Sequence, residues 1–303
     1  ALRALDGLSD DVRPDARRAC RPFGENCGFT MSESAQIMVL FDDELALELG
    51  APTLAAIPDV FVSADGPKKS ISGPGIGNYV TFAKSAALLK NLLGDRRFAS
   101  GGMVQAHGTS TPQNRVTESQ IMSQVAVAMG VQKWRVGAIK SFIGHSLGAA
   151  AGDQLSAMLG VWETGLMPGI TTLDGIASDV ATDRLEFALR TEATEAPDYA
   201  LINSKGFGGN NATAAVLGPN VTQELLKKHY GERKLSDWQT AHESVQIRRA
   251  SMESARLEGS WAPRYHFNEG VLDPEAVEVD AAQIRLGDRT VDLSTTFPDS
   301  WQL

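Results

Sequence analysis

The sequence predicts an α/β fold in which strands and helices alternate along the chain. Short apolar runs of strand length, such as residues 57–63 and 103–106, are followed by segments with apolar residues at helical spacing, such as 79–93 and 118–129. This alternation is typical of a sheet with helices packed on its faces. Three apolar runs end in glycine-containing loops, where the backbone can turn tightly. We therefore expect the three loops to converge at one edge of the sheet.

The other elements follow from the same patterns. Further strands are expected at four places, in chain order 35–41, 134–142, 199–203 and 212–217, the last two forming a hairpin-like pair. Helices are expected at 42–50, which is acidic in its first turn, and at 147–160. After Gly218 the chain becomes charged and helix-prone, and short strand-like pieces follow at 276–279 and 284–286.

The composition excludes several classes of protein. With 303 residues, 43% of them hydrophobic and 21% charged, the chain resembles a globular protein of the cytoplasm. A net charge of −9 provides no basic field for nucleic acid, and no apolar run approaches the ~18 residues of a membrane span. Two cysteines, Cys20 and Cys27, form neither a disulfide framework nor a CxxC zinc pair. We expect no metal and no cofactor.

Two histidines are the candidate functional residues. His107 follows the apolar run that begins at Met103, and His145 follows the run that begins at Trp134, with Lys140 five residues before it. Each imidazole precedes small residues that leave room for a ligand. Two histidines and a lysine beside such turns favour a catalytic site. Hydrogen-bonded structural histidines are the alternative, and residue types alone leave both open.

A rival motif predicts a serine hydrolase. Gly144-His-Ser-Leu-Gly148 fits G-x-S-x-G, in which a nucleophilic serine stands on a sharp turn between a strand and a helix. Ser146 would then attack an ester, and His107-Gly108 would supply an oxyanion-hole loop. The base would come from one of three downstream histidines, His229, His242 or His266. This hypothesis explains one of the three glycine loops and gives Lys140 no role.

Three motifs in order resemble the β-ketoacyl synthase family. They are His107-Gly-Thr-Ser-Thr111, Lys140-Ser-Phe-Ile-Gly-His145 and Asn203-Ser-Lys-Gly-Phe-Gly-Gly-Asn-Asn211, preceded by the similar segments Arg21-Pro-Phe23 and Gly28-Phe-Thr-Met-Ser-Glu33. The resemblance covers about residues 20–218 and implies a thiolase-like layered α-β-α-β-α fold. By this resemblance, residues 1–55 would be the end of the N-terminal half of that fold, and residues 56–218 would be its C-terminal half. Residues 219–303 would be a C-terminal extension. The motifs are more similar to the bacterial fatty-acid type of the family.

The resemblance also implies an activity and roles for residues. The family performs a decarboxylative Claisen condensation of an acyl-CoA or acyl-ACP with malonyl-ACP, where ACP is acyl carrier protein. His107 and His145 would donate N–H bonds to the malonyl thioester oxygen, and Lys140 would hold the surroundings of the second histidine. The predicted substrate-binding residues are Thr109 and Thr111 for the pantetheine amides, Phe207 as gate of the acyl site, and its neighbours Gly206 and Gly208.

Departures from the family pattern qualify this picture. Neither cysteine stands where the family carries its nucleophile, so the nucleophilic cysteine is expected upstream of residue 1, in a missing N-terminal half. Gln154 stands where the family has a carboxylate, and Asn114-Arg115 replaces a frequent Gly-Asp. A homodimer is expected from the family. A non-catalytic partner subunit resembling a chain-length factor is the alternative, although the retained histidines argue against it.

Overall fold

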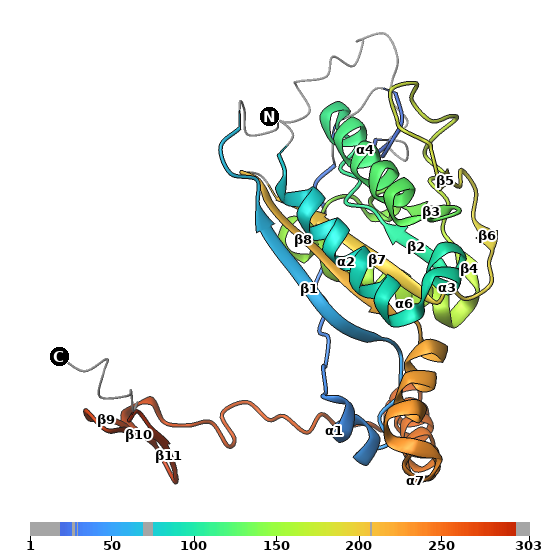
Figure 1. Ribbon diagram of the computed structural model, residues 1–303. Coiled ribbons are helices and arrows are strands. Elements are labelled where there is room, and N and C mark those ends of the chain that lie inside the picture. Colours follow the sequence, from blue (N-terminus) through green and yellow to red (C-terminus); the bar gives the residue numbers. More distant parts are fainter. Residues whose placement is uncertain (1–18, 26–27, 29, 69–74, 207, 295–303) are drawn as a thin grey trace, which may run out of the picture. The chain divides into compact units, whose positions relative to one another are not determined.

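The computed structural model describes residues 19–25, 28, 30–68, 75–206 and 208–294, in two compact units, Ala1–Val245 and Gln246–Leu303. The first unit contains a mixed sheet whose strand order is β1-β8-β7-β2-β3-β5 (Figure 1). The predicted α/β layering is therefore confirmed.

The sheet has an antiparallel side and a parallel side. Its strands, in sheet order, are β1 (Ala56–Ala64), β8 (Asn210–Leu217), β7 (Tyr199–Lys205), β2 (Gly102–Gln105), β3 (Trp134–Gly137) and β5 (Leu185–Phe187). β1, β8 and β7 pair antiparallel, whereas β7, β2, β3 and β5 pair parallel. The three glycine-containing loops follow β7, β2 and β3, which are adjacent. Their carboxyl ends meet at one edge of the sheet, as the sequence predicted.

Helices cover both faces of this sheet. α2 (Gly77–Leu93) and α4 (Pro112–Met129) pack on one face, and α6 (Ala150–Thr164) packs on the other. The shorter elements of this unit are α1 (Asp43–Glu48), α3 (Asp95–Ser100), α5 (Lys140–Ile143), the 3-10 turn η3 (Leu147–Ala149), β4 (Leu166–Met167) and β6 (Glu192–Ala193). In the described residues, no helix combines the length and hydropathy needed to cross a bilayer.

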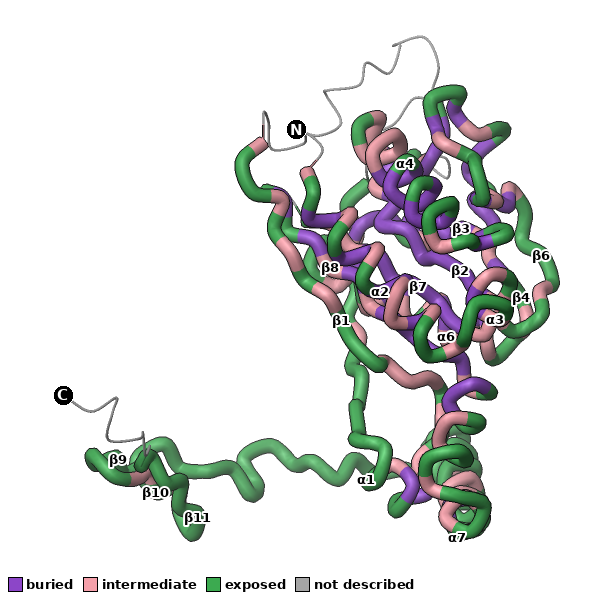
Figure 2. Tube along the Cα trace, in the orientation of Figure 1, coloured by how far each residue is buried: buried purple, intermediate pink, exposed green. Residues whose placement is uncertain are grey.

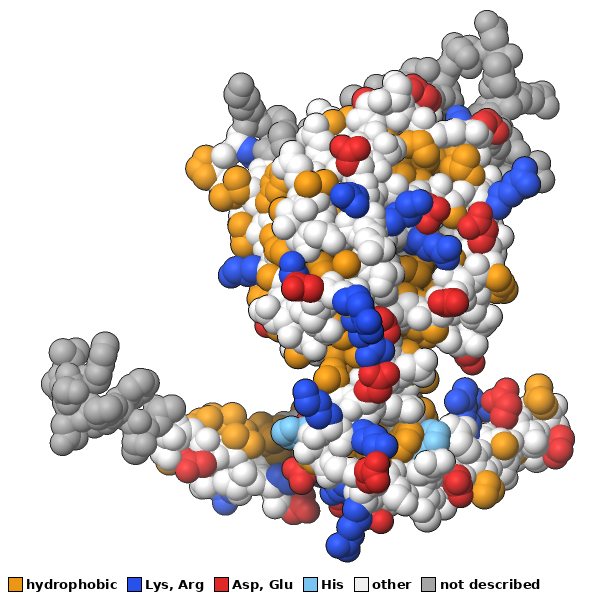
Figure 3. Space-filling model, turned by 45° about the vertical axis from the view of Figure 1, so that its right-hand side comes forward, with side chains coloured by type: hydrophobic (Ala, Val, Ile, Leu, Met, Phe, Trp, Pro, Cys, Tyr) orange, Lys and Arg blue, Asp and Glu red, His pale blue; other side chains and the backbone are white. Residues whose placement is uncertain are grey.

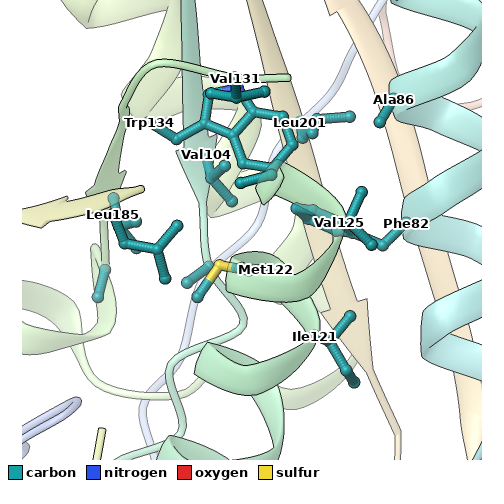
Figure 4. Close-up of a cluster of buried hydrophobic side chains, with 14 of the residues drawn as sticks. Phe82, Ala86, Val104, Ile121, Met122, Val125, Val131, Trp134, Leu185 and Leu201 are labelled. Carbon is teal, nitrogen blue, oxygen red and sulfur yellow. The ribbon is translucent and has the colours of Figure 1, made fainter. Parts of the chain in front are cut away.

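The central strands are buried on both sides. Val104 and Leu201 join the cluster on the α2 and α4 face, which Figure 4 shows around Trp134. Their chain neighbours Met103 and Ala200 point to the α6 face. Consecutive strand residues face opposite ways, so a continuous apolar run indicates a strand covered on both faces. Figure 2 shows this burial along β2 and β7.

The C-terminal helix begins in the first unit. α7 (Pro219–Leu257) is interrupted at Gly231, whose φ is 83°. Within the first unit, Trp238 Nε1 donates to the carbonyl of Ala51 at 3.0 Å, and His242 Nδ1 lies 2.9 Å from the carbonyl oxygen of Gly50. This part of α7 is thereby joined to the turn that follows α1.

The second unit is small and largely exposed. It contains the end of α7, the 3-10 turn η4 (Pro274–Ala276) and a three-stranded antiparallel sheet of β11 (Arg289–Asp292), β10 (Gln283–Leu286) and β9 (Val277–Val279). Val279 is 66% exposed, so these strands bury little apolar surface within the described chain. The strand-like pieces expected near 276–279 and 284–286 are confirmed.

The surface mixes charges of both signs. Acidic and basic side chains are interspersed over the face in Figure 3. Arg97 contacts both Asp198, at 2.7 Å, and Glu224, and Lys133 lies 3.6 Å from Glu186. An exposed pair such as Lys133 with Glu186 contributes little to stability, typically ~0–1 kcal/mol.

One predicted strand is wrong, and another is shorter than predicted. Residues 35–41 form no strand and are largely exposed, Ile37 being 92% accessible, because no other strand pairs with them in the described chain. The strand expected at 134–142 ends at Gly137, since Lys140 already starts α5. The helix expected from Leu147 begins at Ala150, after a 3-10 turn. Residues 219–245 belong to the first compact unit, and the division of the chain into family halves and extension stays a prediction.

Candidate active site

His107 lies at the carboxyl end of β2 and is 4% exposed. Its backbone N–H donates to Glu118 Oε1 at 2.7 Å, and the N–H of Gly108 donates to Oε2 at 2.9 Å. Gly108 has a φ of 49°, and a Cβ there would lie 3.1 Å from the Cβ of Ala138. A glycine therefore suits both the backbone turn and the close approach of the next loop.

Glu118, on α4, joins the loop of His107 to the neighbouring strand. Besides the two backbone donors, its oxygens accept from Asn203 Nδ2 at 2.6 Å and from Asn114 Nδ2 at 2.9 Å. Four hydrogen bonds satisfy a carboxylate that is fully buried. Glu118 was not among the residues predicted from the sequence. Its position on the same helix face as the buried Met122 was the available signal.

His145 is fixed by a segment far upstream in the chain. Its backbone N–H donates to Thr30 O at 2.7 Å, and its carbonyl accepts from the N–H of Ser32 at 3.0 Å. Gly144 has a φ of 75°, and a Cβ there would meet Thr30 O at 2.9 Å. These bonds place the imidazole of His145 beside that of His107, with ring centroids 5.3 Å apart and planes at 84°.

Both imidazoles are held neutral. Burial and the charge of Lys140 keep the pKa of His107 well below its usual value, with smaller contributions from His145 and Lys205. The same two causes lower the pKa of His145 to about 4, against an opposing effect of Asp153. The N–H of Leu147 donates to Nδ1 of His145 at 3.1 Å. Because Nδ1 accepts, neutral His145 carries its proton on Nε2 and can donate from there.

Lys140 is buried between the two loops, at 2% exposure. Its Nζ donates to the backbone carbonyl of His107, the first histidine, whereas the resemblance placed it with the second. Burial lowers the pKa of Lys140 to about 8, opposed by Glu118, Cys20 and Asp153. Lys140 therefore remains mostly protonated at pH 7. Its positive charge lowers the pKa of both imidazoles.

The contacts of Gln154 account for the glutamine that stands where the family has a carboxylate. Its Nε2 donates to three main-chain carbonyls, those of Gln105 at 2.9 Å, Ala106 at 2.8 Å and Asn203 at 2.9 Å. These carbonyls lie at the ends of β2 and β7, so one amide joins the strand ends that lead into two of the loops. A carboxylate has no N–H to donate at this position.

The departure at Asn114-Arg115 also has structural partners. Asn114 binds Glu118, as described above. Arg115 makes paired bonds from Nε and Nη2 to the carboxylate of Asp179, at 2.7 and 2.9 Å, and lowers the pKa of that carboxyl. Its Nη1 donates to Gly24 O at 2.8 Å, next to the Arg-Pro-Phe segment.

The predicted substrate-binding residues lie at the same edge of the sheet. Thr109 Oγ1 and Thr111 Oγ1 are 3.1 Å apart, and both residues are partly exposed. The N–H of Gly206 donates to Asn210 O at 2.7 Å, and Gly208 is exposed with a φ of 87°. Phe207 lies outside the described residues, as does Cys27. Cys20 is buried near Lys140.

The geometry does not support the serine hydrolase hypothesis. The hydroxyl of Ser146 donates to the carboxylate of Asp153, which also accepts from Gln36. β3 ends at Gly137, and α5 lies between that strand and Ser146. The serine therefore does not stand on a turn that leads directly from a strand into a helix, as a nucleophile elbow requires.

Comparison with known proteins finds a matching family. Residues 55–174, which include both histidines and Lys140, match the model of the β-ketoacyl synthase C-terminal domain. This part of the chain belongs to that domain family. The thiolase-like fold implied by the three motifs is therefore confirmed.

Relatives of this chain include bacterial synthases that act on acyl carrier protein thioesters by name. It is 45% identical over 284 residues to β-ketoacyl-[acyl-carrier-protein] synthase FabY of Pseudomonas aeruginosa, covering 93% of this chain and 44% of the relative. The crystal structure of the noncanonical ketosynthase FabY from P. aeruginosa superimposes with a TM-score of 0.83 at 42% identity, covering 95% of this chain and 45% of that one. The chain thus spans about half the length of the curated relatives it matches.

The two relatives match different shares of this chain. The 3-oxoacyl-[acyl-carrier-protein] synthase 2 of Vibrio cholerae is 30% identical over 215 residues, which is 70% of this chain and 49% of the relative. The FabY match leaves only 7% of the chain outside it. It must therefore include most of the residues after Gly218, so most of the C-terminal part of this chain is similar to FabY.

Proposed function

We propose that this chain is the C-terminal part of a bacterial β-ketoacyl-ACP synthase. The complete protein would condense an acyl-CoA or acyl-ACP with malonyl-ACP in fatty acid biosynthesis, releasing carbon dioxide. The pair of buried, neutral imidazoles carries this proposal, with His145 as an Nε2–H donor. The names of the bacterial relatives support the substrate class.

The histidine pair suits the chemistry of decarboxylation. When the bond between the carboxylate carbon and the α-carbon breaks, its electron pair passes to the α-carbon and the thioester oxygen. Neutral N–H donors fixed in a site of low dielectric stabilise this developing charge more than they stabilise the bound substrate. In the described chain, Nδ1 of buried His107 has no hydrogen-bond partner, so no contact at that atom fixes which ring nitrogen of His107 carries the proton.

The remaining steps need groups on both sides of the site. The carbanion attacks the carbonyl of an acyl thioester and expels a cysteine thiolate, and we assign that cysteine to an N-terminal half outside this chain. Thr109 and Thr111 would bind the pantetheine amides, and Phe207 with Gly206 and Gly208 would contact the acyl group. We further propose a homodimer that works in the cytoplasm and takes its substrates from acyl carrier protein.

A non-catalytic partner subunit is the weaker candidate. Burying Lys140 and two imidazoles costs free energy, because the ammonium is removed from water and polar ring atoms are removed with it. A subunit that only shapes the acyl tunnel of its partner gains nothing from that cost. The presence of all three side chains in one buried cluster therefore favours the synthase.

The test is an assay of the complete protein with malonyl-ACP and an acyl donor. We expect carbon dioxide and β-ketoacyl-ACP in equal amounts, measured by gas capture and mass spectrometry. A variant with Ser146→Ala should retain this activity. The proposal fails if no carbon dioxide is released, and the hydrolase hypothesis returns if Ser146→Ala alone abolishes turnover of a simple ester.

A further inference from the structure

Lys205 is a second lysine at this edge of the sheet, and none of the roles above uses it. It is the last residue of β7, which pairs parallel with β2 so that Ile202 lies opposite Gln105. Lys205 and His107 therefore leave adjacent strands at the same edge. In keeping with this placement, the charge of Lys205 makes a small contribution to the low pKa of His107, after burial, Lys140 and His145.

The ammonium group of Lys205 has N–H donors that the described residues do not use. Its Nζ donates to a neutral hydroxyl, Thr117 Oγ1, at 3.3 Å, and it forms no ion pair with a carboxylate in the described part of the chain. An ammonium has three donors, and removing it partly from water without a counter-ion is costly. Burial accordingly lowers its pKa, while Glu118 and Asp65 oppose that shift.

The two nearby carboxylates are already engaged. Glu118 accepts four hydrogen bonds, as described above. Asp65 lies 2.9 Å from Lys68 Nζ, and its other oxygen accepts from Gly77 N and from Asn211 Nδ2 at 3.0 and 2.8 Å. Lys140 differs from Lys205, since its amine is bound to a backbone carbonyl behind the first histidine. Among the described residues, Lys205 is therefore a cation at this edge of the sheet with donors left for an anionic ligand.

We propose that Lys205 binds the carboxylate of the malonyl group and selects malonyl thioesters over uncharged acyl thioesters in the second half-reaction. This inference rests on the proposed function. In a malonyl thioester the carboxylate is one carbon away from the thioester carbonyl that the histidines bind. A cation beside His107 is placed to meet it. The acyl donor of the first half-reaction has no such group.

Lys205 would act on binding rather than on the bond-breaking step. Carbon dioxide leaves as a neutral molecule, so the contact weakens as the transition state forms. An interaction that weakens in the transition state lowers KM and lowers kcat with it, so its removal raises KM without lowering kcat. Lys205 is thus a specificity-determining residue, whereas the histidine donors lower the barrier.

The test compares Lys205→Met with the unchanged complete protein. Loss of one charge-assisted hydrogen bond predicts that KM for malonyl-ACP rises about 10- to 100-fold. The value of kcat should not fall, and the rate of acyl transfer from the acyl donor should not change. Lys205→Arg should restore most of the affinity. Lys133→Met is the matched control, because Lys133 is exposed and pairs with Glu186 on another edge of the fold.

Two outcomes overturn the inference. KM for malonyl-ACP is unchanged in Lys205→Met, or both half-reactions lose affinity equally, which would mean that Lys205 contacts the carrier or pantetheine. A binding assay separates this inference from the proposed function. The unchanged protein should bind malonyl-pantetheine at least tenfold more tightly than acetyl-pantetheine, and Lys205→Met should lose that preference. If discrimination is present without carbon dioxide release, only the proposed function fails; without discrimination, the inference fails.

Discussion

His107 and His145 are held in place by different means. The loop of His107 is fixed by a buried carboxylate, that of Glu118, and the loop of His145 by main-chain bonds to residues 30–32. Both rings depend on burial and on Lys140 for their neutral state. The requirement for neutrality has a measurable effect on stability.

The low pKa of His145 predicts that the protein loses stability in mild acid. Between its unfolded pKa near 6.5 and its folded pKa of about 4, the unfolded chain binds a proton that the folded chain does not. Stability therefore falls as pH is lowered through that window, by at most about 1.4 kcal/mol per pH unit for this residue. Denaturant unfolding from pH 7.5 to 4.5 measures the effect. Replacement His145→Gln should flatten the curve, and an equal slope in both proteins would contradict the assigned pKa.

Gln154 should be important for stability. Gln154→Leu removes the donor from three main-chain carbonyls at the ends of β2 and β7, and buried carbonyls without partners are costly. We expect the free energy of unfolding to fall by about 3 kcal/mol. Gln120→Leu, on the exposed side of α4, is the control and should change it little. Equal stability of the two variants would rule out this role.

Sequence patterns find some of these residues and miss others for a physical reason. His107, Lys140 and His145 stand in short motifs with glycines on either side, so they are visible locally. Glu118 is defined by donors from Asn203, 85 positions away, which no local pattern contains. The amine of Lys140 binds the first histidine rather than the second because the loops converge in space.

Three adjacent parallel strands, β7, β2 and β3, create the site. Their loops were recognisable from glycines after apolar runs, so the convergence at one edge was predictable. The length of β3 was not predictable. The strand ends at Gly137, and the chain from Lys140 forms the helix α5 instead of continuing the strand. Residues 35–41 have an apolar run of strand length, but strand formation also requires a pairing partner, and the described chain supplies none.

The packing of α1 against α7 depends on Gly50. Its φ is 64°, and a Cβ there would lie 2.5 Å from the backbone carbon of Ala241. Gly50→Ala should therefore separate the part of α7 around Trp238 from this turn and expose the Trp238 side chain. Tryptophan fluorescence and hydrogen exchange in α7 would report the change.

Gly130→Ala is a control that separates backbone strain from the clash between the new Cβ and α7. Gly130 has a φ of 76°, and a Cβ there would meet no atom within 4 Å. Gly130→Ala should show only the strain of a left-handed backbone, about 1 kcal/mol. If Gly50→Ala costs no more than this control, the contact with α7 does not depend on the glycine.

Under the proposed function, the chain as a whole provides one side of a condensing site. It supplies both histidines, Lys140 and Lys205, and it spans about half the length of its curated relatives. The family and fold were predictable because three motifs occur in order. The form of residues 246–294 was less so, since their strands are short and expose apolar residues such as Val279.

The rate of carbon dioxide release from malonyl-ACP in a single turnover tests the central claim most directly. It should be measured with His107→Ala and His145→Ala in the complete protein, alongside acyl transfer from the donor. We predict that each substitution slows decarboxylation by about a hundredfold or more while acyl transfer persists, because each removes a donor to the developing oxyanion. Unchanged decarboxylation, or equal loss of both half-reactions, would contradict the account.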